Sequence, residues 1–354
     1  MTILGNLRGG AAFISISSRS SAPRHGGASA KLKKWTSAVS SEASTTPTSI
    51  SSLNHNTTRQ LASSSQQQQQ QNAQILSCWN RLFDVEVPEG RCVGLELVDF
   101  GNDDTRSLEP EMITTNASHW IHSLLHEEEV AYGVTLPSPS RRDTFFIGRM
   151  AVREALGILG DTTNNGGERR RNPWEIAWTR GIPPILKDEH GRPTMPKGYV
   201  GSISHKGRAG VGIVARDETY SSPEDPPKVG IGVDLEYTTN SRRNISRRVL
   251  TEHEIASLGQ VEGVTEEEEV MLRFSLKECI YKSVHPLICQ YVGFQEAEVT
   301  PHSNGTATVT WKIKSGAHER LGDITAHWRR LEDGSDYFLS SSSAVLREEE
   351  DVTK

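Results

Sequence analysis

Residues 229–236 read VGIGVDLE, and residues 273–282 read RFSLKECIYK. The first stretch is predicted to be a β-strand, and residues two apart on a strand point to the same side of the sheet. Asp234 and Glu236 therefore share one face, while Val233 and Leu235 pack on the other. Two neighbouring carboxylates repel each other unless a positive group lies between them. Oxygen ligands of this kind suit a hard cation such as Mg²⁺.

The second stretch belongs to a predicted helix with two distinct faces. Successive side chains on a helix are about 100° apart. That spacing places Phe274, Glu278 and Lys282 on one side. The opposite side is apolar and is predicted to be core: it carries Leu272, Leu276, Cys279 and Ile280. Taken alone, each motif also has a plain structural interpretation: two acids on an edge strand, and a helical ion pair between residues four apart.

Composition excludes several functional classes. The chain has 354 residues, 35% of them hydrophobic, and a net charge of −6, which argues against a general nucleic-acid binder. The four cysteines form no CxxC pair, so neither a zinc site nor a disulfide framework is predicted. No apolar run approaches the roughly 20 residues that span a bilayer, so no membrane segment is predicted.

Residues 1–75 are predicted to be a disordered leader rich in Ser, Thr and Ala that ends in a glutamine run. The leader contains basic residues but no acidic one before Glu42. That bias is typical of an organelle transit peptide, and a plain disordered tail explains it equally well. The location therefore stays open between the cytosol and an organelle such as a plastid or mitochondrion.

Ordered structure is predicted from about residue 75. A strand pattern covers residues 91–100, and helix-like segments cover 118–132 and about 141–159. On the second of these helices, one stripe is apolar and another carries Arg142, Arg149 and Arg153. A solvated basic face is the plain interpretation of that stripe. Further along, the sequence predicts a strand at 174–180, a turn at 190–196 and two strands around a tight turn within 200–215.

The Pro-rich loop at residues 221–228 is predicted to be a junction between subdomains. Beyond it, Thr251 with Glu254 and Thr265 with Glu268 have the spacing of capping boxes that begin helices. Strands are expected at 297–300, 306–313 and 337–346. The predicted organisation has four parts: a leader at 1–75, an N-terminal subdomain at 76–225, a C-terminal subdomain at 226–346 that carries the metal site, and an acidic tail at 347–354.

The order of these motifs resembles the 4′-phosphopantetheinyl transferase superfamily, in particular its monomeric enterobactin- and surfactin-type branch. The resemblance covers about residues 118–300. Its motifs are FFIGRMAVREALGILG, HGRPTMPKGYVGSISHKG, GIGVDLE and RFSLKECIYKSVHPLICQYVGFQEAEVT, in that order. It implies an α+β fold: a pseudo-dimer of two similar α/β subdomains, with coenzyme A (CoA) bound in the cleft between them.

The resemblance also assigns roles to matching positions. Asp234, Glu236 and Glu278 would hold Mg²⁺, and Glu278 would also be the general base. Lys282 would contact the CoA pyrophosphate and stabilise the leaving group. The other residues expected to contact CoA are Arg149 at the 3′-phosphate, Gly191 and Arg192 against the adenine, Ser204 and His205 at the phosphates, and Lys277 as a weaker phosphate contact.

The reaction implied is transfer of the 4′-phosphopantetheine arm from CoA to a serine of an apo acyl, peptidyl or aryl carrier protein. Adenosine 3′,5′-bisphosphate is released, and the enzyme is a Mg²⁺-dependent holo-acyl-carrier-protein synthase. Carrier proteins are usually acidic around their serine. A basic docking surface is therefore expected at Arg242, Arg243, Arg247 and Arg248, which could equally be a solvated helix face.

Two alternatives remain open at this point. Another Mg²⁺-dependent phosphate enzyme, such as a nuclease, would also cluster acids with a lysine, although the SISH and GRP segments and the net acidity are unusual for one. A non-catalytic protein that binds CoA or a carrier could keep the fold. The presence of all three expected metal ligands counts against this alternative, because a protein that had lost catalysis would not need them.

Overall fold

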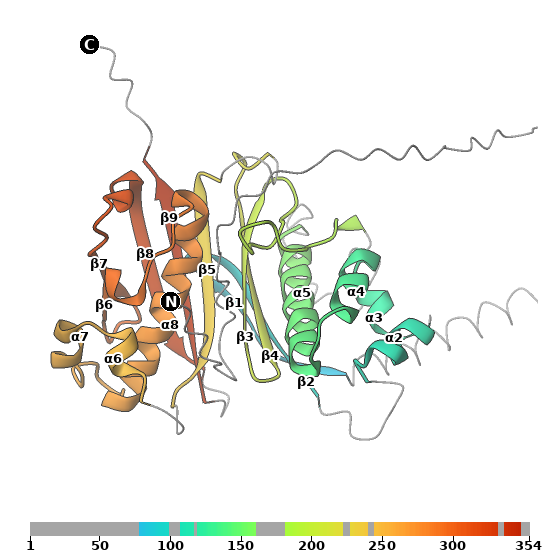
Figure 1. Ribbon diagram of the computed structural model, residues 1–354, viewed down its shortest axis with the longest axis horizontal. Helices are drawn as coiled ribbons and strands as arrows, with labels where there is room; N and C mark the ends of the chain where they lie inside the picture. The colour runs from blue at the N-terminus through green and yellow to red at the C-terminus, as the bar shows by residue number, and fades with distance from the viewer. Residues whose placement is uncertain are drawn as a thin grey trace, which may run out of the picture. The chain divides into compact units, whose positions relative to one another are not determined.

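The first half of the described chain is built on an antiparallel sheet with the strand order β1-β2-β4-β3 (Figure 1). The computed structural model describes residues 78–98, 107–116, 119–160, 181–221, 227–239, 244–331 and 336–347. The strands are β1 (Trp79–Val87), β2 (Gly90–Leu97), β3 (Tyr199–Lys206) and β4 (Ala209–Arg216). The helices of this half are α2 (Pro110–Thr115), α3 (Ile121–Leu124), α4 (Glu127–Val134) and the long α5 (Pro139–Gly160), which packs on the sheet.

The second half has an antiparallel sheet with the strand order β5-β9-β8 and one long helix, α8 (Glu266–Ile288), packed on it. The strands are β5 (Val229–Tyr237), β8 (Leu321–Arg330) and β9 (Tyr337–Leu346). A separate two-stranded ladder joins β6 (Ala297–Pro301) to β7 (Ala307–Trp311). The short helices are α6 (Ser246–Val249), α7 (Glu252–Ala256), η4 (Phe294–Glu296) and η5 (Ala317–Arg320).

The two halves repeat one plan. Strands β2-β4-β3 with α5 correspond to strands β5-β9-β8 with α8. A buried glutamate is used in the same way in both halves: Glu129 closes the capping box of α4 and Glu254 closes that of α7. One oxygen of each accepts from a cation on the long helix, Arg153 or Lys277. The predicted α+β pseudo-dimer is therefore confirmed.

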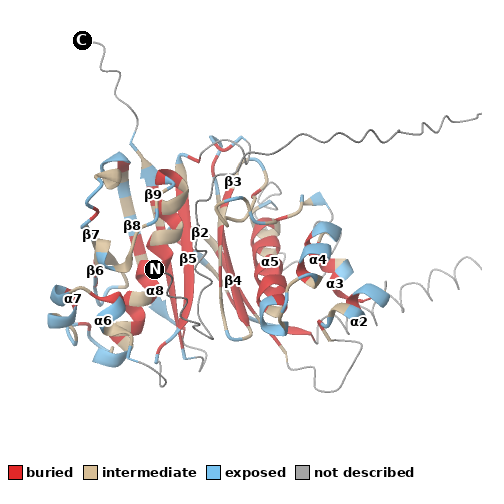
Figure 2. Cartoon of the chain, viewed as in Figure 1, coloured by how far each residue is buried: buried red, intermediate tan, exposed pale blue. Residues whose placement is uncertain are grey.

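The hydrophobic core of the first half extends onto the second half. Ile231, Val233 and Leu235 of β5 belong to the same apolar cluster as α5 and β4. Figure 2 shows buried residues along α5, β4 and β5. Because side chains alternate along β5, its other face, which carries Asp234 and Glu236, is left to meet α8.

A buried carboxylate joins the two halves at a second place. Glu89, in the turn between β1 and β2, is 5% exposed. It accepts hydrogen bonds from Ser341 Oγ of β9 at 2.7 Å and Thr325 Oγ1 of β8 at 3.1 Å, and it contacts His327 Nδ1 at 2.5 Å. Because the carboxylate is shielded from water, these contacts replace its hydration and fix the β1–β2 turn against the second sheet.

Most predicted elements are confirmed, with two strands missed. The helix expected at 141–159, the tight turn between β3 and β4, and the helices that begin after Thr251 and Thr265 are all present. Strands β1 and β8 were not predicted. The strand expected at 174–180, the leader at 1–75 and the acidic tail lie outside the described residues. The boundary predicted near residue 225 falls between β4 and β5.

Among the described helices, none combines the length and apolar character needed to cross a membrane.

Glu89→Ala should destabilise the protein by about 2 kcal/mol, because it leaves the buried Ser341 hydroxyl and the half-buried His327 ring without their acceptor. Urea unfolding would measure the change. Glu86→Ala, in the same hairpin, is the matched control, since the Glu86 side chain is 80% exposed. We expect the control to stay within about 0.5 kcal/mol of the parent. Equal stability of the two variants would contradict a fixing role for Glu89.

Candidate active site

Two glycines let α8 lie directly on strand β5. A Cβ atom at Gly230 would collide with the carbonyl oxygen of Ser283, and one at Gly232 would collide with that of Cys279. The helix backbone therefore occupies the space that side chains would fill at these positions. Asp234 and Glu236 are the next two residues on that face of β5, and they lie beyond the glycines where the helix backbone touches the strand.

Three carboxylates meet where β5 and α8 come together. Asp234 and Glu236 are each 4% exposed, and Glu278 of α8 is 6% exposed. The charges of Asp234 and Glu236 both act on Glu278. The sequence prediction that these three side chains lie together agrees with this placement. Burial of three acids at one place is costly unless positive groups accompany them.

Two lysines supply part of that compensation. Lys282 Nζ of α8 donates to Asp234 Oδ1 at 2.8 Å and to the Val233 carbonyl at 2.9 Å. Lys206 Nζ, at the end of β3, lies 2.5 Å from Glu236 Oε1 and 2.7 Å from Oε2. Lys206 was not among the predicted site residues, because in sequence it is only the first residue of a turn. Its role depends on how close β3 lies to β5.

Glu278 is the acid without a partner. Within the part of the chain that the structure describes, its carboxylate has no hydrogen bond or ion pair. Burial raises the pKa of Glu278 to about 7; Lys282 lowers it, and Asp234 and Glu236 raise it further. A carboxyl group with a pKa near neutrality can accept or release a proton under physiological conditions.

Ser204 and His205 come from β3 in the first half. Ser204 Oγ donates to Asp234 Oδ1 at 2.7 Å, so this serine connects the two halves at the acidic cluster. Burial lowers the pKa of His205 to about 4, with Lys282 and Lys187 lowering it further and Asp234 opposing them. The imidazole is therefore neutral near pH 7 and lies within electrostatic reach of both the acids and a group of cations.

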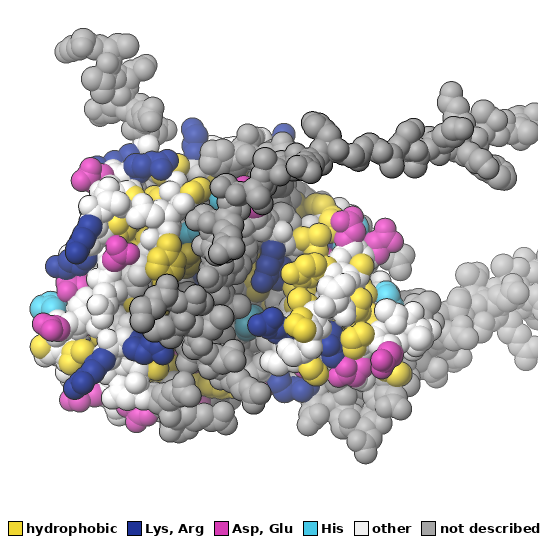
Figure 3. All heavy atoms as spheres, in the orientation of Figure 1, with side chains coloured by type: hydrophobic (Ala, Val, Ile, Leu, Met, Phe, Trp, Pro, Cys, Tyr) yellow, Lys and Arg dark blue, Asp and Glu magenta, His cyan; other side chains and the backbone are white. Residues whose placement is uncertain are grey.

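That group of cations surrounds Arg149 of α5. Arg149 is 4% exposed, its Nε donates to the Ile185 carbonyl at 2.9 Å, and its guanidinium lies 4.2 Å from the centre of the Phe145 ring. Burial lowers the pKa of Arg149 to about 10, so it remains cationic. Burial and then the charges of Arg149 and Arg141 lower the pKa of Lys187. Three cations at one place attract an anion such as phosphate. Figure 3 shows Lys and Arg side chains along the inner edge of the α4 and α5 region.

Gly191 and Arg192 lie in a tight turn that reaches α8. Asp188 Oδ1 accepts from the backbone N–H groups of His190 and Arg192, and the Asp188 carboxylate also pairs with the Arg192 guanidinium. Gly191 has a φ of +82°, which favours glycine. The His190 ring lies 6.0 Å from that of His285 on α8, so the turn crosses from the first half to the second.

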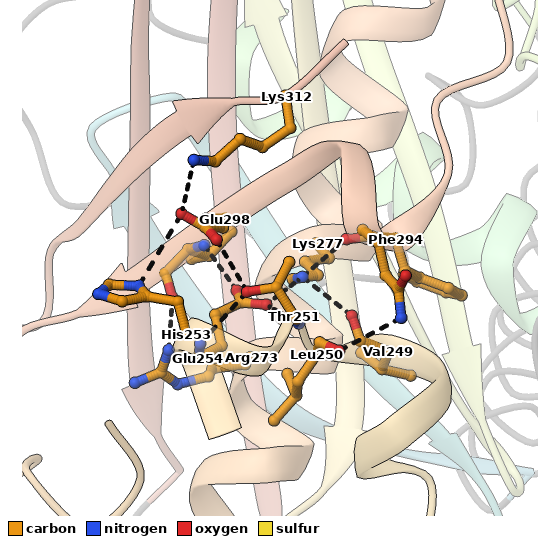
Figure 4. Close-up of polar contacts among 12 residues, drawn as sticks. Val249, Leu250, Thr251, His253, Glu254, Arg273, Lys277, Phe294, Glu298 and Lys312 are labelled. Atoms are coloured by element: carbon orange, nitrogen blue, oxygen red, sulfur yellow. Dashed lines mark hydrogen bonds and ion pairs between the residues drawn. The ribbon is translucent and has the colours of Figure 1, made fainter. Parts of the chain in front are cut away.

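Lys277 does not belong to this site. Its Nζ donates to Glu254 Oε2 at 2.6 Å, to the Phe294 carbonyl at 2.7 Å and to the Val249 carbonyl at 2.9 Å (Figure 4). All three ammonium donors are therefore used inside the protein. The prediction that Lys277 contacts phosphate is corrected: the side chain fastens α6, α7 and η4 to α8.

The oxygen atoms of Asp234, Glu236 and Glu278 are the type of ligand that a hard cation prefers. In this structure, however, Asp234 and Glu236 contact lysines. Within the described ranges, no set of three or more His, Cys, Asp and Glu side chains is placed to coordinate a metal ion. The donors are oxygen atoms only, and the unpartnered Glu278 leaves a surplus of negative charge. Both properties suit Mg²⁺.

Comparison with known families agrees with both halves of the structure. Residues 230–339 match the family model described as the 4′-phosphopantetheinyl transferase superfamily, and residues 128–215 match the 4′-phosphopantetheinyl transferase N-terminal domain. The first match contains β5 and α8, and the second contains α5 and β3. These two segments of the chain belong to the 4′-phosphopantetheinyl transferase superfamily.

Two curated proteins are similar to part of the chain. It is 29% identical over 129 residues to the 4′-phosphopantetheinyl transferase PptT of Mycobacterium tuberculosis, covering 36% of this chain and 52% of that protein. It is 29% identical over 122 residues to the transferase Npt of Nocardia iowensis, covering 34% of this chain and 50% of that protein. The chain thus spans about half the length of the curated relatives it matches.

Solved structures that resemble the chain include an apo-ACPS structure from Chronobacterium ammoniagenes, with a TM-score of 0.27 and 22% identity over 34% of this chain and 98% of that one. The holo-acyl-carrier-protein synthase of Neisseria meningitidis also has a TM-score of 0.27, with 19% identity over 32% of this chain and 96% of that one.

Glu278→Gln should stabilise the protein at high pH when a chelator removes divalent cations. The raised pKa favours the protonated carboxyl group in the folded state. Its contribution to stability is therefore complete below the ordinary value of 4.5 and is lost as the pH rises through about 7. At about pH 8 we expect the variant to be up to about 3 kcal/mol more stable than the parent, and at about pH 4.5 the two should be equal.

Urea unfolding at several pH values would test this expectation. Glu252→Gln, at an exposed position on α7, is the control and should show no such pH dependence. A stability difference between Glu278→Gln and the parent that is constant from acid to alkaline pH would show that the acid is not desolvated.

Lys277→Met should lower stability by about 3 kcal/mol, because it leaves the buried Glu254 carboxylate without its cation. The side chains of Glu254 and Lys277 are 1% and 2% exposed. Lys312→Met, which removes an exposed ion pair with Glu298, is the control and should cost less than about 1 kcal/mol. Thermal and urea unfolding would measure both. A Lys277 variant as stable as the control would contradict the assigned role.

Proposed function

We propose that the protein transfers the 4′-phosphopantetheine arm of CoA to a serine of an apo carrier protein and releases adenosine 3′,5′-bisphosphate. The carrier would be of the fatty-acid, polyketide or peptide-synthetase type. The observation that supports this most strongly is the meeting of Asp234 and Glu236 on β5 with Glu278 and Lys282 on α8. These motifs lie within the part of the chain that matches the superfamily.

The proposed donor site runs from the acidic cluster to the Arg149 cations. Lys282 would contact the pyrophosphate and stabilise the leaving phosphate, as a compact ammonium can. His205 and Ser204 would contact the phosphates beside it. Arg149, with Lys187, would hold the 3′-phosphate, because the guanidinium makes only one hydrogen bond among the described residues. Gly191 and Arg192 would lie against the adenine.

The chemical step is phosphoryl transfer to an alcohol. The serine oxygen of the carrier forms a bond to the β-phosphorus of CoA, which carries the pantetheine. The bond from that phosphorus to the bridging oxygen breaks, and adenosine 3′,5′-bisphosphate leaves. Glu278 accepts the serine proton, directly or through a water molecule. Because a carboxylate that binds a cation is a poor base by itself, the route through a water molecule is the better candidate.

Asp234, Glu236 and Glu278 would hold Mg²⁺. The ion, when bound, supplies neutralisation of phosphate charge and orients the pyrophosphate. The residues of the chain have separate roles. The acids would bind the cation, Lys282 would bind the phosphate of the leaving group, and Glu278 would accept the serine proton.

The single-chain, enterobactin-type branch of the superfamily is the best candidate for the subgroup. Both transferase halves are present in one chain, so one copy can form the complete cleft as a monomer. For the carrier surface, Arg247 and Arg248 of α6 are exposed and suit an acidic partner. The other two arginines expected there, Arg242 and Arg243, lie outside the described residues.

Incubation with CoA, Mg²⁺ and a panel of apo carrier proteins would test the proposal. At least one carrier should gain the mass of one phosphopantetheine group, and EDTA should abolish the gain. Failure on every type of carrier, with the protein folded and CoA intact, would overturn the transferase assignment. Cleavage of a nucleic acid under the same conditions would favour the alternative of another Mg²⁺-dependent phosphate enzyme.

Glu278→Gln should lower kcat by about 100- to 10,000-fold, because it removes the proposed base. Asp234→Asn and Lys282→Met should also abolish most transfer while the protein stays folded. Lys312→Met, far from these contacts, is the matched lysine control and should keep parental kcat. Full activity of both Glu278→Gln and Asp234→Asn would show that the assigned site is wrong.

A further inference from the structure

Lys206 holds Glu236 in a two-oxygen contact. Its Nζ lies 2.5 and 2.7 Å from the two carboxylate oxygens, and Oε1 also accepts the backbone N–H of Tyr237 at 2.8 Å. The carboxylate is 5% exposed, whereas the Lys206 side chain is 20% exposed. The ammonium therefore closes the outer side of a buried acid.

Aromatic rings support the ammonium in that position. Lys206 Nζ lies 5.4 Å from the centre of the Tyr237 ring, close enough for a cation–π contact. The Tyr237 ring stacks on that of Tyr337 with 4.9 Å between centres. The residue after Lys206 is Gly207, with a φ of +59°, and a Cβ there would collide with the Tyr237 hydroxyl. The turn thus brings Lys206 and Tyr237 together.

Among the described residues, two of the three acids in the cluster contact a lysine, and the third does not. Asp234 has Lys282, Glu236 has Lys206, and Glu278 has neither. A divalent cation that binds all three acids needs the oxygens that Lys206 now occupies. Lysine is suited to exchange, because its charge sits at the end of a flexible four-carbon chain that can move toward solvent.

We propose that Lys206 is a tethered counter-ion for Glu236, which a divalent cation must displace to reach that carboxylate. Lys206 thereby stabilises the metal-free protein and weakens its affinity for the cation. This rests on the proposed metal role of Asp234, Glu236 and Glu278. Lys206 is a positioning residue: it acts through Glu236 and does not touch CoA.

Titration of the CoA-free protein with Mn²⁺, followed by electron paramagnetic resonance, tests the inference without an activity assay. Lys206→Met should bind Mn²⁺ about tenfold more tightly than the parent, because no charge-assisted contact has to be broken. Lys206→Arg keeps the cation and should bind no more tightly than the parent. Lys312→Met removes a distant lysine and should leave the affinity unchanged.

Lys206→Met leaves the buried Glu236 carboxylate without its cation, which destabilises the metal-free protein, so two further variants accompany it. Lys206→Gln keeps a donor to Glu236 without the charge and should still bind Mn²⁺ several-fold more tightly. In Lys206→Met/Glu236→Gln the acid is gone, and the gain in affinity should disappear. Equal Mn²⁺ affinity of Lys206→Gln, Lys206→Arg and the parent would overturn the inference.

The outcomes separate this inference from the proposed function. If Glu278→Gln abolishes Mn²⁺ binding but the Lys206 variants match the parent, the metal site stands and the counter-ion role fails. If neither the parent nor any Lys206 variant binds Mn²⁺, the metal role of the three acids and the counter-ion role both fail. Transfer to a carrier, assayed separately, then decides whether the activity itself is correctly assigned.

Discussion

The site depends on the direct contact between the backbone of α8 and strand β5. Gly230 and Gly232 allow this contact, because any side chain there would collide with the helix. It brings the face of β5 that carries Asp234 and Glu236 against the face of α8 that carries Glu278 and Lys282. Acids placed so close to a helix lose their water, which makes the accompanying lysines necessary. The packing that brings the three acids together therefore favours binding of a cation, and it also destabilises the protein when no cation is bound.

The two halves share one arrangement of strands and helices but carry different residues on their long helices, which explains their different contributions. On α8, Arg273 lies four residues before Lys277 and pairs with Glu269, four residues earlier still. On α5 the same spacing gives Phe145, Arg149 and Arg153, so an aromatic ring replaces the glutamate. Arg153 and Lys277 both bind the capping glutamate of their own half. Arg149 consequently keeps its charge without an ion pair among the described residues, and is available to an anion.

Sequence periodicity predicted the parts of the site that lie on single elements. The two-residue alternation of β5 placed Asp234 and Glu236 on one face, and the helical spacing of α8 placed Glu278 and Lys282 on one face. That these two faces meet was implied only by the family resemblance, and the contact of Lys282 with Asp234 agrees with it. Helical spacing already put Lys277 off the face of Glu278 and Lys282, and only the family resemblance suggested that it contacts phosphate. The sequence could not exclude this suggestion, because the contact between Lys277 and Glu254 depends on tertiary packing. Lys206 and Lys187 were missed for the same reason. The pattern of β8, LGDITAHWRR, has too few apolar residues to stand out as a strand, and its burial comes from pairing with β9.

Among the described residues, the strand whose glycines lie directly under the long helix carries acidic residues in the second half and none in the first. In the first half the glycines under the helix, Gly210 and Gly212, lie on β4, where a Cβ would collide with the backbone of α5. The helix α5 is therefore seated on β4, a strand without acidic residues, and Glu154 of α5 pairs with Arg81 of β1. Within the part of the chain that the structure describes, the two similar halves thus form one cluster of buried acids, at β5 and α8. The first half supplies the complementary groups, Ser204 and Lys206 at the acids and Arg149 with Lys187 beside them. This division explains why the arrangement requires both halves in contact.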